Sequence, residues 1–142
     1  MILSGVLPNP PEILALLDEL KIRVVDDDLL ACSRRYLFSR SRAEEPFEAL
    51  AERYFSMPPC TTRNSPIKER MTNLLDKVEG SNAKGVIFCM FKFCEPELFD
   101  LPHLIEGLKE RGLPTLVVDV EPNQGLTGQL TTRIEAFAEM MR

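Results

Sequence analysis

The segment CMFKFCEPELFDLPHL, residues 89–104, begins in an apolar run and then turns on a proline. The residues before it, GVIF at 85–88, are β-branched or aromatic after a glycine, which is typical of a buried strand. Cys89 therefore lies within a strand expected over 85–91, and Cys94 lies just past its end. A strand cysteine usually packs as a small apolar residue, whereas the loop leaving a parallel strand is where α/β proteins place their chemistry. We expect different roles for these two thiols.

The rest of the chain alternates strand and helix patterns. The other strands are expected at 1–7, 21–25 and 114–120. The helices are expected at 11–20, 44–55, 67–80, 96–112 and 130–142. Apolar strands without alternation, joined by helices, indicate a parallel sheet covered on both faces. The sequence predicts one three-layer α/β domain over 1–142, with about four parallel strands, of the Rossmann-like or flavodoxin-like type.

In such a sheet the segments that follow the strands meet at one edge. Cys94 is therefore expected to share a crevice with the acidic run DDD at 26–28, taken as a turn, and with the loop 121–129. Cys60 lies in a proline-rich loop at 56–66 that could fold over this crevice. None of the strand-to-helix turns carries a GxGxxG or P-loop motif for nucleotide phosphates.

Composition narrows the class of protein. The 142 residues are 44% hydrophobic and 27% charged, which suits one ordinary core. A net charge of -5 argues against a nucleic-acid partner. No apolar run approaches the length of a membrane span, and the first residues, MILSGVLPNPP, lack the basic start of a signal peptide. We expect a cytoplasmic protein with no membrane association.

Four cysteines occur, at positions 32, 60, 89 and 94, without CxxC pairing, which favours reduced thiols or metal ligation. Cys60 is interpreted either as a packed loop thiol, which is the favoured alternative, or as a metal ligand. For Cys94 two interpretations are equally favoured: a residue that closes the sheet edge, and a reactive thiol near Lys92. The single histidine, His103, is expected at a helix surface, so a cysteine hydrolase lacks a base. Iron–sulfur clusters accept thiolates from separated loops, so Cys60 and Cys94 could share a ligand set that needs at least one more member.

Four stretches resemble one family in their order and spacing. They are RVVDDDLLACSRRY (23–36), PPCTTR (58–63), GVIFCMFKFCEPELFDLPHLIEGLKERGLPTLVVDVE (85–121) and GQLTTRIEAFAEMM (128–141). Together they resemble the C-terminal part of subunits of the 2-hydroxyacyl-CoA dehydratase and benzoyl-CoA reductase family, of the 2-hydroxyglutaryl-CoA dehydratase D-component type. By this resemblance the chain corresponds to a C-terminal domain, and the family's N-terminal domain is absent from it.

The resemblance implies a cofactor and a set of site residues. Family subunits hold a 4Fe-4S cluster with cysteines from two α/β domains, and Cys60 and Cys94 fall on ligand positions. Cys32 and Cys89 match no ligand position. Arg34 matches a family arginine, a candidate for substrate binding, although this chain has Cys32 or Ser33 where a glycine usually precedes that arginine. The remaining ligand would come from an N-terminal domain or a partner subunit.

The resemblance also implies a reaction. Family members remove water from a 2-hydroxyacyl-CoA, or reduce an aromatic acyl-CoA, through a ketyl radical made with a low-potential electron. An ATP-dependent activator protein supplies that electron, and this chain is not expected to be active alone. The alternatives are an electron-relay or assembly subunit of the same fold, and an α/β binding module without a cluster.

Arginines 34, 35, 40 and 42 form the one basic cluster of the chain. They could pair with the phosphates of coenzyme A. The favoured interpretation is a solvated basic surface that balances glutamates 44, 45 and 48.

Overall fold

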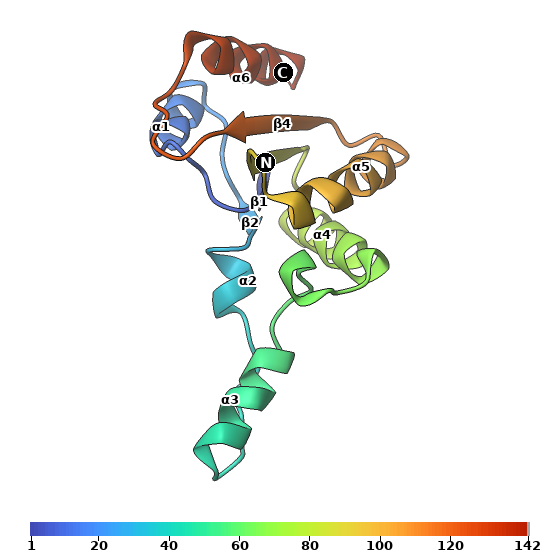
Figure 1. The fold of residues 1–142 in the computed structure, drawn as a ribbon. Coiled ribbons are helices and arrows are strands. Elements are labelled where there is room, and N and C mark those ends of the chain that lie inside the picture. Colours follow the sequence, from blue (N-terminus) through green and yellow to red (C-terminus); the bar gives the residue numbers. More distant parts are fainter. Residues whose placement is uncertain (142) are drawn as a thin grey trace.

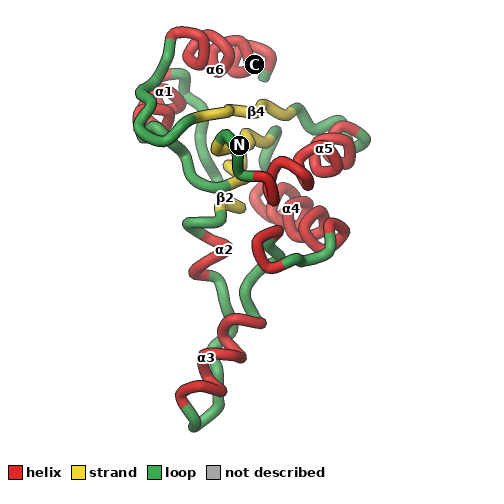
Figure 2. The backbone as a smooth tube through the Cα atoms, viewed as in Figure 1, coloured by secondary structure: helices red, strands yellow, loops and turns green. Residues whose placement is uncertain are grey.

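The computed structural model describes residues 1–141, in which four strands alternate with helices (Figures 1 and 2). The strands are β1 (Ile2–Gly5), β2 (Asp26–Leu29), β3 (Val86–Phe91) and β4 (Thr115–Val120). The helices are α1 (Glu12–Glu19), α2 (Ser33–Tyr36), α3 (Pro46–Phe55), α4 (Ile67–Ser81), α5 (Glu95–Lys109) and α6 (Gly128–Met140), with a 3-10 turn, η1 (Thr61–Arg63). All strands are parallel in the order β2-β1-β3-β4. The expected α/β fold is confirmed, and this order matches the first four strands of a flavodoxin-like sheet.

The two faces of the sheet carry separate apolar cores. Along β3, Ile87 and Cys89 pack with α1 and α6 on one face, whereas Phe88 and Met90 pack with α4 and α5 on the other. This alternation follows from the two-residue period of a strand, because successive side chains point to opposite faces. Cys89 is 1% exposed and belongs to the first of these cores, so the expected packing of this strand cysteine as a small apolar residue is confirmed. Within residues 1–141, no helix combines the length and the apolar character needed to cross a bilayer.

The second strand differs from its expected position. A strand was predicted over 21–25 with the acidic run at 26–28 as a turn, but β2 begins at Asp26 and contains all three aspartates. The residues directly after α1 form hydrogen bonds with the end of that helix, since the Ile22 N–H donates to the Leu17 carbonyl at 2.8 Å. Residues 21–25 therefore form the connection from α1 to the sheet, and the prediction of a strand there is wrong.

Aspartate is unfavourable in most strands, and β2 accepts it because cations and hydroxyls from other elements meet its carboxylates. Lys77 Nζ lies 3.1 Å from Asp26 Oδ1, and Ser4 Oγ of β1 donates to Asp28 Oδ2 at 2.8 Å. β2 is also an edge strand, where charged side chains discourage pairing with another chain.

An arm made of α2, α3 and their connection leaves the sheet at the carboxyl end of β2. Figure 1 shows α3 extending away from the layered part of the molecule. α3 has no buried residue, and its Phe47 and Phe55 are 85% and 81% exposed. The helix predicted over 44–55 is confirmed, whereas α2 was not predicted from the sequence.

Candidate functional site

The order in which the chain adds strands to the sheet reverses between β1 and β3. From β1 the chain continues to β2 on one side, and from β3 it continues to β4 on the other. Ligands of α/β proteins bind at such a switch point, outside the carboxyl ends of the strands. β1 ends there at Gly5, whose φ of +109° suits glycine, and a Cβ at this position would collide with the Cys89 carbonyl. The next residue, Val6, donates its N–H to the same carbonyl at 2.9 Å. The two strand ends are thus held in close contact.

Cys94 lies at this switch point, at the start of α5. Lys92 and Phe93 separate it from β3, and Phe93 adopts a left-handed φ of 68° with its ring 89% exposed. The Cys94 N–H donates to the Phe91 carbonyl at 3.1 Å, and the Cys94 carbonyl accepts from Leu98 N–H at 3.0 Å. This tight turn lets α5 begin at once and places a half-buried thiol at its amino-terminal end.

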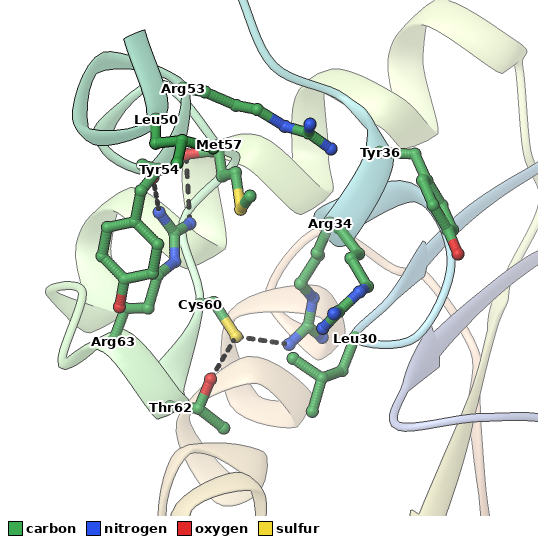
Figure 3. A pocket seen from close by; sticks show the side chains of 11 residues that line it. Leu30, Arg34, Tyr36, Leu50, Arg53, Tyr54, Met57, Cys60, Thr62 and Arg63 are labelled. Atoms are coloured by element: carbon green, nitrogen blue, oxygen red, sulfur yellow. Dashed lines mark hydrogen bonds between the residues drawn. The ribbon is translucent and has the colours of Figure 1, made fainter. Parts of the chain in front are cut away.

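Cys60 lies at the start of η1 and is 2% exposed. Its sulfur lies 3.2 Å from Thr62 Oγ1 and accepts an N–H from Arg34 Nη1 at 3.7 Å (Figure 3). The hydroxyl of Thr61 donates to the Pro96 carbonyl at 2.9 Å. The Cys60 loop is therefore fastened to the first turn of α5, the helix that Cys94 precedes.

A buried ion network lies beneath the Cys60 loop. Arg34, 2% exposed, donates to Asp28 Oδ1 and Oδ2 at 3.1 Å each and to Glu97 Oε1 at 2.5 Å. Glu97 also accepts from Arg70 at 3.0 Å, and Arg70 donates to Asp100 at 2.7 Å. The network thus joins β2, α2, α4 and α5.

Burial by itself lowers the pKa of Arg34, but the charges and hydrogen bonds of Asp28 and Glu97 outweigh it, so the net pKa is raised. The interpretation as a solvated basic surface is wrong for Arg34, while Arg35, Arg40 and Arg42 are exposed as expected. Substrate binding by Arg34 stays a prediction.

Arg70 and Glu97 were not predicted as part of the site, although the sequence carries a signal for both. Arg70 stands one helical repeat before the buried Leu74 and Val78 of α4. Glu97 likewise lies on the face of α5 that carries the buried Leu104. A charged residue in register with a buried apolar stripe indicates a buried partner of opposite charge.

The other thiols and the imidazole stand apart from this arrangement. Burial raises the pKa of Cys89 to about 12. Burial first and the charge of Asp27 second raise the pKa of the half-buried Cys32 thiol. His103 is exposed, as expected. Cys32 and Cys89 are consequently poor candidates for thiolate ligands.

Cys60 and Cys94 fit part of an iron–sulfur ligand set and not the whole of one. In the part of the chain that the structure describes, no group of three or more histidine, cysteine or acidic side chains is arranged to hold a metal. A cubane cluster takes up to four thiolates, and these can come from separate segments. Two thiols on adjoining segments at one sheet edge match such a partial set.

A pocket of about 540 Å³ opens beside Cys60, between α2, α3 and η1 (Figure 3). Its charged lining residues are all arginines: Arg34, Arg35, Arg53 and Arg63. The other lining residues include Tyr36, Tyr54, Leu50 and Met57. The pocket is therefore cationic with an apolar side.

Comparison with known proteins gives one family. The family model described as 2-hydroxyglutaryl-CoA dehydratase, D-component, matches residues 1–141. The chain is 31% identical over 141 residues to the beta subunit of (R)-phenyllactyl-CoA dehydratase from Clostridium sporogenes, a match covering 99% of this chain and 37% of that subunit.

Two further relatives extend the comparison. The beta subunit of lactoyl-CoA dehydratase from Anaerotignum propionicum is 30% identical over 142 residues, covering 99% of this chain and 38% of that subunit. One of the subunits of benzoyl-CoA reductase from Thauera aromatica is 26% identical over 121 residues, covering 84% of this chain and 31% of that protein. The chain thus spans less than two fifths of the length of these relatives.

Proposed function

The chain belongs to the 2-hydroxyglutaryl-CoA dehydratase D-component family, and from that premise we propose that it forms part of the iron–sulfur site of a subunit acting on an acyl-CoA thioester. One observation carries the proposal. The hydrogen bond from Thr61 to the Pro96 carbonyl fastens the Cys60 loop to the turn that follows Cys94. Two thiols on otherwise distant segments are thereby brought to the same edge of the sheet.

Each residue has a distinct part in this proposal. Cys60 and Cys94 are thiolate ligands of a 4Fe-4S cluster, and a cysteine of an N-terminal domain or partner subunit adds to the set. Arg34 donates an N–H toward the Cys60 sulfur and is itself held by two carboxylates. When bound, such a cluster supplies a single low-potential electron. Through Arg34, which Glu97 of α5 holds, the buried ion network keeps the sulfur of Cys60 in place.

The names of the relatives support two reaction types, removal of water from a 2-hydroxyacyl-CoA and reduction of an aromatic acyl-CoA. In both proposed reactions an ATP-dependent activator protein delivers the electron from outside this chain. A relay or assembly subunit would keep the cluster ligands and show no turnover. Measuring turnover of a 2-hydroxyacyl-CoA in the assembled enzyme, with the activator present, separates the enzyme from the relay.

The test of the cluster site is iron and sulfide content after anaerobic reconstitution of the full subunit or complex that contains this chain. Cys60→Ser and Cys94→Ser should each lower the bound iron and change the electron spin resonance spectrum. Cys89→Ala is the matched control, because its thiol lies in the core away from the proposed ligands. Unchanged iron content and spectrum in both serine variants would remove these two cysteines from the ligand set.

A further inference from the structure

The pocket beside Cys60 differs in charge from the rest of the molecule. The chain carries a net charge of -5, yet four arginines and no acidic residue line this pocket. Arg34 is neutralised by Asp28 and Glu97. Within residues 1–141, by contrast, none of the other three arginines forms a salt bridge. Three uncompensated cations therefore surround one hollow.

Two of these cations are held in place by contacts within the chain. Arg63 donates to the Tyr54 carbonyl at 2.8 Å, to the Met57 carbonyl at 3.1 Å and to the Pro58 carbonyl. The Arg53 guanidinium stacks over the Phe38 ring at 3.9 Å from its centroid. Side chains fixed before binding lose less entropy when a ligand arrives.

The available donors face the pocket from two elements. Arg35 of α2 makes no hydrogen bond through its guanidinium in the described part of the chain, and that of Arg53 from α3 is engaged only by stacking. Figure 3 shows the Arg53 guanidinium extending from α3 toward α2, which carries Arg34 and Tyr36, and Cys60 beside the Arg34 guanidinium. Guanidinium groups bind phosphate oxygens with two parallel hydrogen bonds. More than one free cation favours a ligand with more than one negative charge.

We propose that this pocket binds a phosphate-bearing organic anion, with its phosphoryl or pyrophosphoryl group between Arg35 and Arg53 and its organic part against Leu50, Tyr54 and Met57. The inference rests on the proposed function only in that the acyl-CoA substrate is one source of such a group. A free nucleotide is the other source. The shared chemistry is a polyanionic phosphate joined to an apolar or aromatic portion.

The first test is calorimetric titration of the purified chain with inorganic pyrophosphate. One equivalent should bind, and Arg35→Gln and Arg53→Gln should each weaken binding about tenfold to a hundredfold, as expected for the loss of a charged hydrogen bond. Arg40→Gln is the matched control, because it removes the same charge from an exposed residue outside this pocket. Binding should also weaken as ionic strength rises.

Two results would overturn the anion site: absence of pyrophosphate binding at millimolar concentration, or an equal loss of affinity in the Arg40 variant. The source is found by titrating coenzyme A, pantetheine and ADP. Coenzyme A binding that requires Arg35 and Arg53, with no pantetheine binding in this pocket, assigns the site to the substrate phosphates. Tighter binding of ADP than of coenzyme A assigns it to a free nucleotide.

The anion site and the cluster site fail separately. Iron content measured in Arg35→Gln should equal that of the wild type, since the hydrogen bonds of the Cys60 sulfur in the described residues go to Arg34 and Thr62 and not to Arg35. Pyrophosphate affinity that does not depend on Arg35, with the iron content of Cys94→Ser lowered, overturns the anion site and leaves the proposed function intact. If the pyrophosphate affinity depends on Arg35 and the iron content is unchanged in Cys94→Ser, the anion site is supported. Only the proposed role of Cys94 as a cluster ligand is then overturned.

Discussion

Arg34 connects the stability of this protein to its proposed chemistry. Its guanidinium donates to Asp28, to Glu97 and to the sulfur of Cys60, and its side chain is 1% exposed. A buried ion pair adds little net stability compared with apolar residues of the same shape, because both charges lose their hydration. Removing one partner is different, since the remaining charges stay buried without compensation. Removing Arg34 should therefore lower the free energy of unfolding by much more than the intact ion pairs add to it relative to apolar residues.

Arg34→Met should lower the free energy of unfolding by about 3–5 kcal/mol, because it leaves Asp28 and Glu97 without their shared cation. Urea unfolding at neutral pH measures the change. Lys92→Met is the control, since the Lys92 and Glu121 side chains are 47% and 50% exposed and such a pair contributes about 1 kcal/mol or less. Similar small losses in both variants would contradict the buried network.

Cys89 should make stability depend on alkaline pH. Burial raises its pKa from 9.0 to about 12, so above pH 9 the unfolded state releases a proton that the folded state keeps. The free energy of unfolding should therefore fall as pH rises through this range, by about 1.4 kcal/mol per unit from this group. Urea unfolding of wild type and Cys89→Ala between pH 7 and 10 measures it. The variant should be less stable at pH 7 yet show a shallower decline, and parallel curves would refute the assignment.

At the scale of elements, the close approach of β1 to β3 decides where the site forms. Gly5 allows this approach through its positive φ and its missing Cβ, which leaves room for the Cys89 carbonyl. The turn through Phe93, also at positive φ, then starts α5 without a longer loop. Both features place Cys94 beside the switch point.

Gly5→Ala should destabilise the protein by about 1–3 kcal/mol, since alanine meets both the unfavourable φ and the Cys89 backbone. Gly80→Ala is the opposite case, because Gly80 lies in α4 with no atom within 4 Å of an added Cβ. This change should stabilise by about 0.5–1 kcal/mol through helix propensity. Thermal unfolding of the two variants measures the expected loss of stability in Gly5→Ala and the expected gain in Gly80→Ala. A Gly5→Ala protein as stable as the wild type would show that the ends of β1 and β3 are farther apart than in this structure.

At the scale of the whole molecule, folding and cluster binding should be separable. Both faces of the sheet carry their own buried apolar cluster, so the core does not rely on a metal. The proposed ligands, Cys60 and Cys94, are only part of a set. The chain should therefore fold by itself and hold a cluster only with a partner that adds thiolates.

Circular dichroism of the isolated chain with a metal chelator should show the same cooperative unfolding as without it. Anaerobic reconstitution of the isolated chain should leave no lasting stoichiometric iron, whereas the assembled subunit should retain it. Unfolding caused by the chelator would contradict the first expectation. A durable cluster in the monomeric chain alone would contradict the second.

The sequence by itself determined the α/β class, three of the four strands and the place of Cys94. These features follow from local patterns: the apolar run at 85–91 forms β3, and helical spacing forms α4, α5 and α6 at nearly their expected bounds. The resemblance in the motifs around Cys60 and Cys94 also identified the family that the comparison confirms.

Only the tertiary structure decided that Asp26 to Leu29 form β2, that Arg34 is buried and that a cationic pocket opens beside Cys60. Residues far apart in the chain are responsible, since Arg34 and Glu97 are separated by 63 positions. The free energy of a buried charge depends on which opposite charges the fold brings to it. Local propensity places aspartate in a turn and arginine at the surface, and the fold overrides both by pairing them.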